Sequence, residues 1–310
     1  MSAPADVLVH AGLLLLAPPL VMGVVGNTKS WFAGRIGPSL WQPYRDVLKL
    51  LRKTVVLGEP TSWVFRAGPI VGLASVLVAG LLVPLASGAA PVSFAGDVVL
   101  FAGLLALGRF FTMAAALDTG SSFEGMGASR EAAFAAFTEP TLFLALALVC
   151  LPAHAVSFAP AWSALPPLGV WDVAHPLYLL AAAVLFVVLL AENARMPVDD
   201  PATHLELTMV HEVMVLDHSG PDLAFVLYGS AVKLFVVAAL LVHLLLPLPA
   251  GAGWAAVPLF LAGEVGVAVA VGVVESFIAR LRLTRVPGFL ISAAALAAVG
   301  VAVLFARGQP

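Results

Sequence analysis

The sequence has little charge for its length. Of its 310 residues, 11% are charged and 61% are hydrophobic, and the mean hydropathy is +1.05. Such a composition lies far outside the range of soluble globular proteins and is typical of a polytopic membrane protein. The formal net charge of −3 says little about partners. We expect the lipid bilayer and no nucleic acid among them.

Cysteine is almost absent. Cys150 is the only one, and it lies within an apolar run. A single thiol excludes an internal disulfide, an iron–sulfur cluster ligated by this chain alone and a four-thiolate metal site. We therefore expect this chain to bind no cofactor and any redox centre to belong to a partner.

Motifs for catalysis are also missing. No GxSxG elbow occurs, and His211-Glu212 starts an HExxH pattern that fails because Val215 stands where the second histidine is required. His204 and His211 are seven residues apart on one helical face and could bring two imidazoles to one ion, but no third ligand has an obvious place. The sequence predicts neither a catalytic residue nor a metal site.

Long apolar runs dominate the chain instead. Eight are long enough to cross a hydrocarbon layer of about 30 Å, so we expect one all-α integral membrane domain over residues 1–310. No Lys or Arg precedes the first run, so it lacks a signal peptide's basic region and is expected to remain in the mature protein. The runs are Val7–Val25, Val64–Ala86, Val98–Leu117, Ala132–Pro152, Val173–Ala191, Leu223–Leu246, Trp254–Val274 and Pro287–Phe305.

Basic residues gather in alternate connections. The positive-inside rule makes that side cytoplasmic and places both termini outside. Two further basic residues, Arg109 and Lys233, fall within predicted spans. The cytoplasmic set holds twelve of the 15 Lys and Arg: Lys29, Arg35, Arg45, Lys49, Arg52, Lys53, Arg66, Arg130, Arg195, Arg280, Arg282 and Arg285.

Two of these connections predict structure of their own. From about residue 43 to 53, apolar residues recur at helical spacing opposite a charged face, and Pro43 suits the first helical position. The pattern predicts a helix at the cytoplasmic interface, either anchored by anionic lipid or forming a docking surface for a soluble subunit. The third connection, Asp118–Arg130, is rich in Gly and Ser and predicts a loop, with Ser129 capping the next helix.

The connection at about 192–222 concentrates acids and histidines between two apolar runs. Solvating such groups in lipid is costly, so this stretch is the predicted functional centre. Asp200 or Thr203 could cap a short helix between the fifth and sixth spans, which Gly220-Pro221 ends. The acids of this connection that we expect to take part in ion coupling are Glu192, Asp199, Asp200, Glu206 and Glu212; it also holds Asp217 and Asp222.

Three ionisable residues fall at a similar depth within spans. Glu139, Lys233 and Glu264 lie roughly 12–16 Å from the cytoplasmic ends of their helices at 1.5 Å per residue. Glu275 lies nearer the cytoplasmic boundary. Intramembrane acids and lysines mark proton or ion routes, which is the reading we favour for the set. The alternative is a buried Lys233–Glu264 pair that only orders the bundle.

Several stretches resemble one family of membrane subunits. GRIGP at Gly34–Pro38 and AENARMPVD from Ala191 are similar to the subunit that respiratory complex I, as its subunit 1, shares with energy-converting nickel–iron hydrogenases. Longer stretches resemble formate hydrogenlyase subunit 4 and its hydrogenase-4 relatives: Leu117–Glu131, Asp200–Glu212 and Glu275–Pro287. The chain departs from the pattern at Asn193-Ala194, where Thr followed by Gly or Asn is expected, and at Val198, where Phe is usual.

The resemblance implies an eight-helix subunit in a bacterial or archaeal cytoplasmic membrane. Its implied partners are hydrogenase large and small subunits, which carry the nickel–iron centre and iron–sulfur clusters, and antiporter-like membrane subunits. The implied role is to seat the soluble module and link its redox chemistry to proton or sodium movement. By position, Glu192, Asp199, Glu206 and Glu212 match the start of a charged axis, and Arg35 and Arg195 match basic positions facing the soluble module; Arg45, Lys49 and Arg130 are further docking candidates on that side.

Other functions remain open from the sequence. A quinone-site subunit of a respiratory NADH dehydrogenase would show quinone-dependent activity. A stand-alone ion transporter would purify alone and move a solute. A purely structural anchor would tolerate neutralisation of every intramembrane acid.

Overall fold

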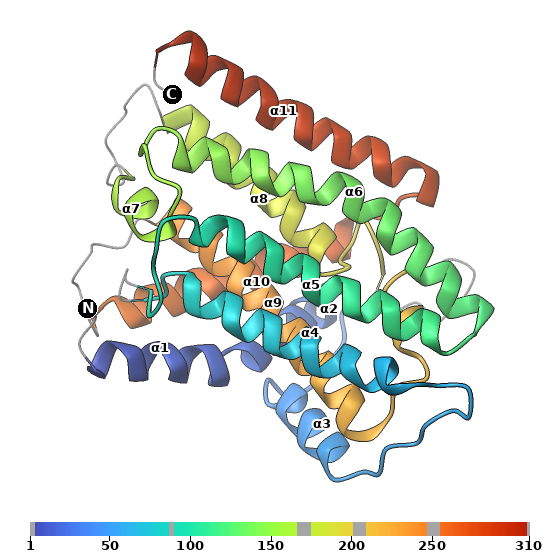
Figure 1. The fold of residues 1–310 in the computed structure, drawn as a ribbon. Coiled ribbons are helices and arrows are strands. Elements are labelled where there is room, and N and C mark those ends of the chain that lie inside the picture. Colours follow the sequence, from blue (N-terminus) through green and yellow to red (C-terminus); the bar gives the residue numbers. More distant parts are fainter. Residues whose placement is uncertain (1–3, 87–89, 166–174, 201–208, 247–254, 309–310) are drawn as a thin grey trace.

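The computed structural model describes residues 4–86, 90–165, 175–200, 209–246 and 255–308, and this part is helical without strands (Figure 1). The long helices run roughly side by side, with both chain ends at one end of the bundle. We call this the terminal end. The opposite end, the loop end, carries the connections at 33–62, 119–121 and 278–285 and the described parts, 193–200 and 209–219, of the 193–219 connection.

Six helices are long and apolar enough to cross a membrane: α4 (Trp63–Leu82), α5 (Asp97–Asp118), α6 (Ser122–Cys150), α9 (Gly220–Leu245), α10 (Ala256–Phe277) and α11 (Val286–Ala306). A bent pair, α1 (Pro4–Leu16) and α2 (Pro18–Phe32), forms a seventh candidate, and α8 (His175–Glu192) is a shorter apolar helix at the position of the predicted fifth span. The predicted all-α, multi-pass architecture is confirmed, with one span broken and one short.

The first predicted span, Val7–Val25, is not continuous. The chain bends by 42° between α1 and α2, at Pro18-Pro19. Neither proline has an N–H, so carbonyls of the preceding turn lose their helical donors. Tyrosine hydroxyls donate to two carbonyls at the bend: Tyr228 donates to that of Leu15 at 2.7 Å, in place of the missing Pro19 N–H, and Tyr44 donates to that of Leu16.

The predicted loop at Asp118–Arg130 is wrong for most of its length. Helix α6 begins at Ser122, so only residues 119–121 are irregular and Ser129 is within the helix. Gly and Ser weaken a helix intrinsically, but tertiary contacts override this preference. At Gly127 a side chain would lie 2.9 Å from Met214 Cγ and 3.0 Å from the Val210 carbonyl, so only glycine allows α6 to approach the loop there.

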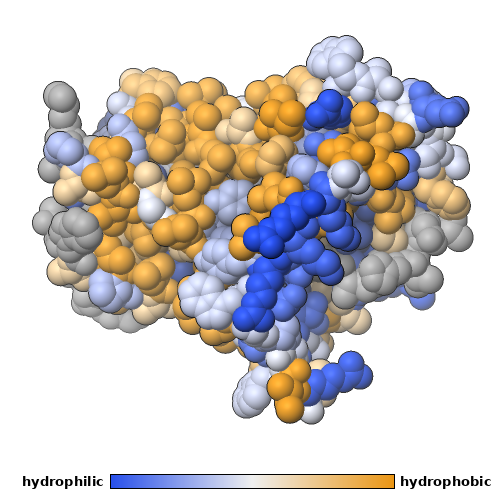
Figure 2. Space-filling view, turned by 90° about the horizontal axis from the view of Figure 1, so that it is seen from below, coloured by the Kyte–Doolittle hydropathy of each residue, from blue (hydrophilic) through white to orange (hydrophobic). Residues whose placement is uncertain are grey.

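Helix α3 (Gln42–Leu51) confirms the helix predicted at about 43–53, with Pro43 in its first turn. It contacts α2 and α9 and buries none of its residues, while Leu48 and Leu51 are exposed. From the side that α3 faces, apolar atoms cover the terminal-end half of the molecule and hydrophilic atoms gather towards the loop end (Figure 2). This distribution fits a helix lying at the edge of the hydrocarbon layer.

Shorter elements complete the described chain: α7 (Phe158–Ser163) and the 3₁₀ turns η1 (Glu212–Val215) and η3 (Leu283–Arg285). The short helix predicted between the fifth and sixth spans falls partly on residues 201–208, outside the described residues. In the described part of that connection, η1 is the helical element, and α9 begins at Gly220 as the Gly220-Pro221 break predicts.

Close contact between α4 and α5 depends on Gly68. A Cβ built at this position would lie 2.7 Å from the Ala115 Cβ and 3.1 Å from the Phe111 carbonyl. On the same pair of helices, Gly103 is exposed and has no atom within 4 Å of such a Cβ. Gly68 is therefore a tightly packed position, and Gly103 is an open one that can serve as its control.

We expect Gly68→Leu to lower the free energy of unfolding by about 1–3 kcal/mol or more, because overpacking forces α4 and α5 apart. Gly103→Leu should leave it nearly unchanged. Thermal unfolding in detergent, followed by loss of the folded monomer, measures both. Equal thermal stability of the two variants would contradict the packing described.

Candidate functional site

Arg109 is the centre of a buried charge cluster. It lies in the middle of α5, and its side chain is only 6% exposed. Each guanidinium nitrogen faces a different carboxylate: Nε is 3.3 Å from Glu131, Nη1 is 2.6 Å from Glu139, and Nη2 pairs with Glu192. Glu131 and Glu139 come from α6 and Glu192 from the end of α8, so one arginine joins three helices.

Lys233 of α9 extends the cluster. Its ammonium lies 4.0 Å from the second oxygen of Glu192, whose side chain is 1% exposed. Glu192 therefore lies between two cations from α5 and α9. The alternative Lys233–Glu264 pair does not occur, because Lys233 faces Glu192 instead.

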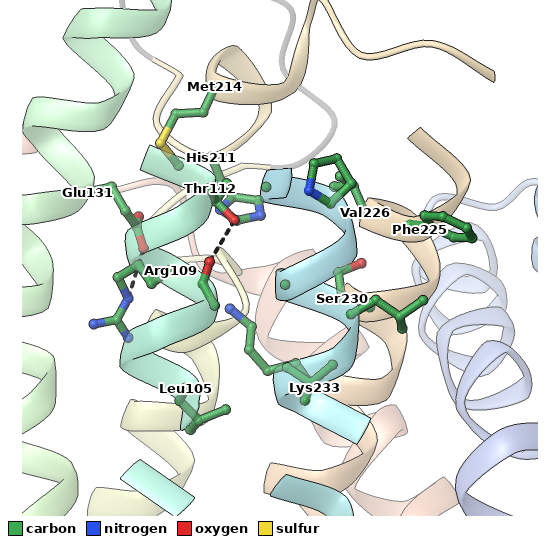
Figure 3. A pocket seen from close by; sticks show the side chains of 17 residues that line it. Leu105, Arg109, Thr112, Glu131, His211, Met214, Phe225, Val226, Ser230 and Lys233 are labelled. Atoms are coloured by element: carbon green, nitrogen blue, oxygen red, sulfur yellow. Dashed lines mark hydrogen bonds and ion pairs between the residues drawn. The ribbon is translucent and has the colours of Figure 1, made fainter. Parts of the chain in front are cut away.

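A cavity of about 60 Å³ adjoins the cluster, with a mostly apolar lining that a few charged and polar side chains interrupt (Figure 3). It lies between α4, α5 and α9, and Arg109, Glu131 and Lys233 line it together with His211. One water needs about 10–15 Å³ measured in this way, so the cavity has room for a few. With charged groups on several walls to bind them, water is the expected content.

The connection after α8 is held next to this cavity by Asp199. One carboxylate oxygen accepts hydrogen bonds from the main-chain N–H groups of Val210 (3.2 Å) and His211 (3.0 Å). The other lies 2.8 Å from the Arg280 guanidinium. Asp199 thus ties the two halves of the connection to the segment between α10 and α11. Its neighbour Asp200 donates a main-chain hydrogen bond to it at 2.9 Å.

Glu275 forms a second ion cluster at the loop end. It pairs with Lys29 of α2 at 2.9 Å and with Arg195 at 3.2 Å. Arg195 also donates to the Met22 sulfur at 2.7 Å. One residue before it, Ala194 has φ +49°, a left-handed conformation that costs a residue other than glycine about 1–2 kcal/mol. The preference of the family pattern for Gly or Asn at this position therefore has a conformational reason, although this chain carries Ala.

Glu264 stands apart from these clusters. Its side chain is fully buried in α10, and within the described chain neither carboxyl oxygen has a hydrogen-bond partner and no cation pairs with it. The similar depth of Glu139, Lys233 and Glu264 is therefore not matched by contact among all three. Glu206, also predicted to belong to the site, lies outside the described residues.

The other predicted residues lie at the loop end. Glu212 opens η1, next to His211. Arg130 donates to the Met209 carbonyl at 2.8 Å and so helps to hold the loop on α6. Arg35, Arg45 and Lys49 are exposed, as expected of residues that could contact a partner.

Sequence reasoning missed three members of the site: Arg109, Glu131 and His211. Arg109 is the one arginine placed within a predicted span, a signal that could have marked it. Glu131 is obscured in the sequence because the predicted span starts one residue later. The sequence raises His211 only as a possible metal ligand, and the described residues contain no group of three or more His, Cys, Asp or Glu placed to hold a metal.

Burial lowers the pKa of the His211 imidazole to about 4, and the nearby Lys233 ammonium adds to the shift. His218, in the same connection, also has its pKa lowered to about 4 by burial, where it stacks on Phe65 at 4.1 Å. Both imidazoles are therefore neutral at physiological pH. Only His211 lines the cavity.

The cluster has the composition of a proton-binding site. Two cations, Arg109 and Lys233, face three carboxylates, so one negative charge is in excess when all are ionised. Binding one proton removes that excess, and losing it restores the charge. Because the groups are poorly solvated, a nearby change of charge acts on this equilibrium more strongly than it would in water.

Comparison with known proteins finds relatives among the membrane subunits of hydrogenases and NADH dehydrogenases. The family model described as NADH dehydrogenase matches residues 5–306. The chain is 34% identical to Hydrogenase-4 component C of Escherichia coli (strain K12), over 77% of this chain and 74% of that protein, and 29% identical to Formate hydrogenlyase subunit 4 of the same organism, over 90% and 92%. It is also 29% identical to an NADH-quinone oxidoreductase subunit of Anaplasma phagocytophilum (strain HZ), over 68% and 65%.

A solved structure shares the fold. A chain of the membrane-bound sulfane sulfur reductase, an archaeal respiratory membrane complex, superposes with a TM-score of 0.82 at 22% identity. The match covers 96% of this chain and 98% of that one. At this identity the likeness is one of fold alone.

Replacing Arg109 by methionine tests the cluster as a structural unit. The change leaves Glu131, Glu139 and Glu192 with Lys233 as their single cation, so we expect the free energy of unfolding to fall by about 3–5 kcal/mol. Adding Glu192→Gln should recover part of this loss, because it removes the most deeply buried carboxylate. Thermal unfolding of the single and double variants in detergent measures both effects. Additive losses would mean that the two residues do not interact.

Proposed function

Since the chain belongs to the NADH dehydrogenase family, which includes subunit 1 of complex I, we propose that it is the membrane-anchoring and energy-coupling subunit of a complex I-like hydrogenase of the formate hydrogenlyase type. The relatives named hydrogenase-4 and formate hydrogenlyase support this branch, because they match over most of both chains. The observation that carries the coupling role is the largely buried Arg109 cluster, beside a cavity that Glu131, His211 and Lys233 also line.

In this proposal the loop end faces the cytoplasm and the soluble redox module. Its connections and the adjoining helix turns hold most of the basic residues, which supports that orientation. Exposed Arg35, Arg45 and Lys49 are the docking candidates. We assign the nickel–iron centre and the iron–sulfur clusters to the soluble subunits, since Cys150 is buried in α6 and offers no cluster site.

Coupling is electrostatic. Reduction or protonation at the redox site changes the charge above the 193–219 connection, which Asp199 holds against the cavity wall. The change alters the proton affinity of the Arg109 cluster, where one carboxylate is in excess. A proton is then taken up or released as the redox state alternates.

The exposure of Glu139 is evidence for a partner subunit within the membrane. The Glu139 side chain is 43% exposed although it sits in the middle of a membrane-crossing helix and pairs with Arg109. A carboxylate facing hydrocarbon is expensive, so this face of α6 requires protein cover. Small residues on the same helix, Ser129, Ala132, Ala133 and Ala136, are exposed and would let a neighbouring helix come close. We propose an antiporter-like membrane subunit here, continuing the route from Glu139.

A quinone-linked function is the second candidate. It is favoured by the 29% identity to the NADH-quinone oxidoreductase subunit of Anaplasma phagocytophilum. The two functions differ in their electron acceptor. A quinone-linked complex would reduce an added water-soluble quinone, and substitutions in this chain would change the rate of that reaction. The hydrogenase-type complex would evolve hydrogen without it.

Affinity purification of the tagged chain in mild detergent tests the proposed assembly. We expect co-purification of a cysteine-rich large subunit, a small subunit and antiporter-like proteins, identified by mass spectrometry. Reversing the charge of the exposed loop-end residues, with Arg45→Glu and Lys49→Glu together, should weaken recovery of the soluble subunits and leave the membrane partners bound. A chain that purifies alone and transports a solute would contradict the proposal.

Neutralising the cluster tests the coupling role. Glu192→Gln keeps the side-chain shape but removes the excess carboxylate, so ion uptake into sealed vesicles should fall by about tenfold or more per hydrogen formed. Hydrogen evolution with an uncoupler present should persist. Glu59→Gln, at an exposed position of the first loop-end connection, is the matched control. Unchanged coupling in an intact Glu192→Gln complex would refute this role.

A further inference from the structure

The loop-end wall of the cavity is formed by two residues of the 193–219 connection, His211 and Met214 (Figure 3). Of the two, only His211 can both accept and donate a proton. Among the labelled groups, Lys233 and Leu105 lie at the opposite end, and Glu131 lies near the same end as His211. The imidazole therefore lies at the loop-end boundary of the cavity.

The position of His211 is fixed through its backbone. Its main-chain N–H donates to Asp199, which is itself paired with Arg280 at 2.8 Å. The adjacent η1 turn packs on α6, where Gly127 allows Val210 and Met214 to approach. These contacts hold the residue without using its ring. Within the described chain, no hydrogen bond engages either ring nitrogen, so both remain available to water.

The charges near His211 come from four helices and from its own connection, while α4 lines the cavity with uncharged residues only. These charges are Lys233 of α9, Arg109 of α5, Glu131 of α6, Glu192 of α8 and the nearby Asp199. The cations disfavour the imidazolium and the carboxylates favour it. Consequently any proton that His211 accepts is passed on readily, and its affinity follows the charge state of the Arg109 cluster.

Two hydroxyl groups, those of Thr112 and Ser230, also line the cavity. The Thr112 hydroxyl donates to the Gly108 carbonyl at 3.0 Å, within its own helix, so its single proton is already committed (Figure 3). Ser230 likewise donates to the Leu227 carbonyl at 2.9 Å. Neither can relay a proton without first breaking that bond.

We propose that His211 is the relay through which protons pass between water on the loop side and the cavity beside the Arg109 cluster. This inference rests on the proposed function, and it names the group that admits the proton. One ring nitrogen takes a proton from a hydronium ion on the loop side, and the other releases its proton to a cavity water. Rotation of the neutral ring, or proton exchange with water at both ring nitrogens, then restores the starting tautomer, so no other reactant is required.

Chemical rescue provides the test. The purified complex is placed in sealed vesicles with reduced methyl viologen as electron donor, and hydrogen evolution is measured alongside quenching of a ΔpH-sensitive dye. His211→Gly should reduce dye quenching per hydrogen formed by about tenfold or more. Millimolar imidazole should restore much of it, because the space left by the side chain admits the free base. The rescue should follow the concentration of neutral imidazole as the pH is changed.

Two further variants separate relay from structure. His211→Asn preserves a polar side chain without a titratable ring and should lose coupling as His211→Gly does. His154→Asn alters an exposed histidine at the terminal end, where asparagine tolerates the positive φ of 49°, and should couple normally. Coupling that is retained in His211→Gly, or lost without rescue by imidazole, would overturn the relay. A wild-type complex that evolves hydrogen without moving protons would refute the proposed function, and the relay with it.

Discussion

The pairing of Arg109 with three carboxylates is the interaction on which the loop-end half of the bundle depends. A guanidinium presents its donors in a planar fork, so one side chain can meet Glu131, Glu139 and Glu192 at once. Glu131 and Glu192, which are largely buried, could not remain ionised there without such a partner. Arg109 and Lys233 together balance only two of the three carboxylates, so the cluster can respond by binding a proton.

The cluster is linked to the loop end by short, well-defined contacts. Asp199 joins the 193–199 and 209–215 segments. Two contacts attach the α10–α11 connection to them: Arg280 pairs with Asp199, and the Leu281 N–H donates to the Pro197 carbonyl at 2.9 Å. Arg130 secures the same loop to α6, the helix that carries Glu131 and Glu139. A partner pressing on these connections would therefore act on the cavity wall and the cluster together.

The sequence was sufficient for the architecture and for part of the site. Apolar runs predict the membrane helices, and the opposed faces of residues 43–53 predict α3, because both are local patterns. The Arg109 cluster could not be derived in this way. Helical rise fixes the depth of a residue but not the direction in which its side chain points, so Glu264 shares a depth with Lys233 and still lies apart from it. Propensity alone misplaces the start of α6, because contact of Gly127 with Val210 and Met214 decides the helix there.

In the proposed coupling, the Arg109 cluster gains or loses a proton in step with the redox state of its partner. Reaction-induced infrared difference spectroscopy on the whole complex measures this directly, because a protonated carboxyl group has a carbonyl band that a carboxylate lacks. We expect such a band to change when the redox module is reduced, and the change to disappear in Glu192→Gln but not in Glu264→Gln. A spectrum without any carboxyl change on reduction, or one unaffected by Glu192→Gln, would contradict it.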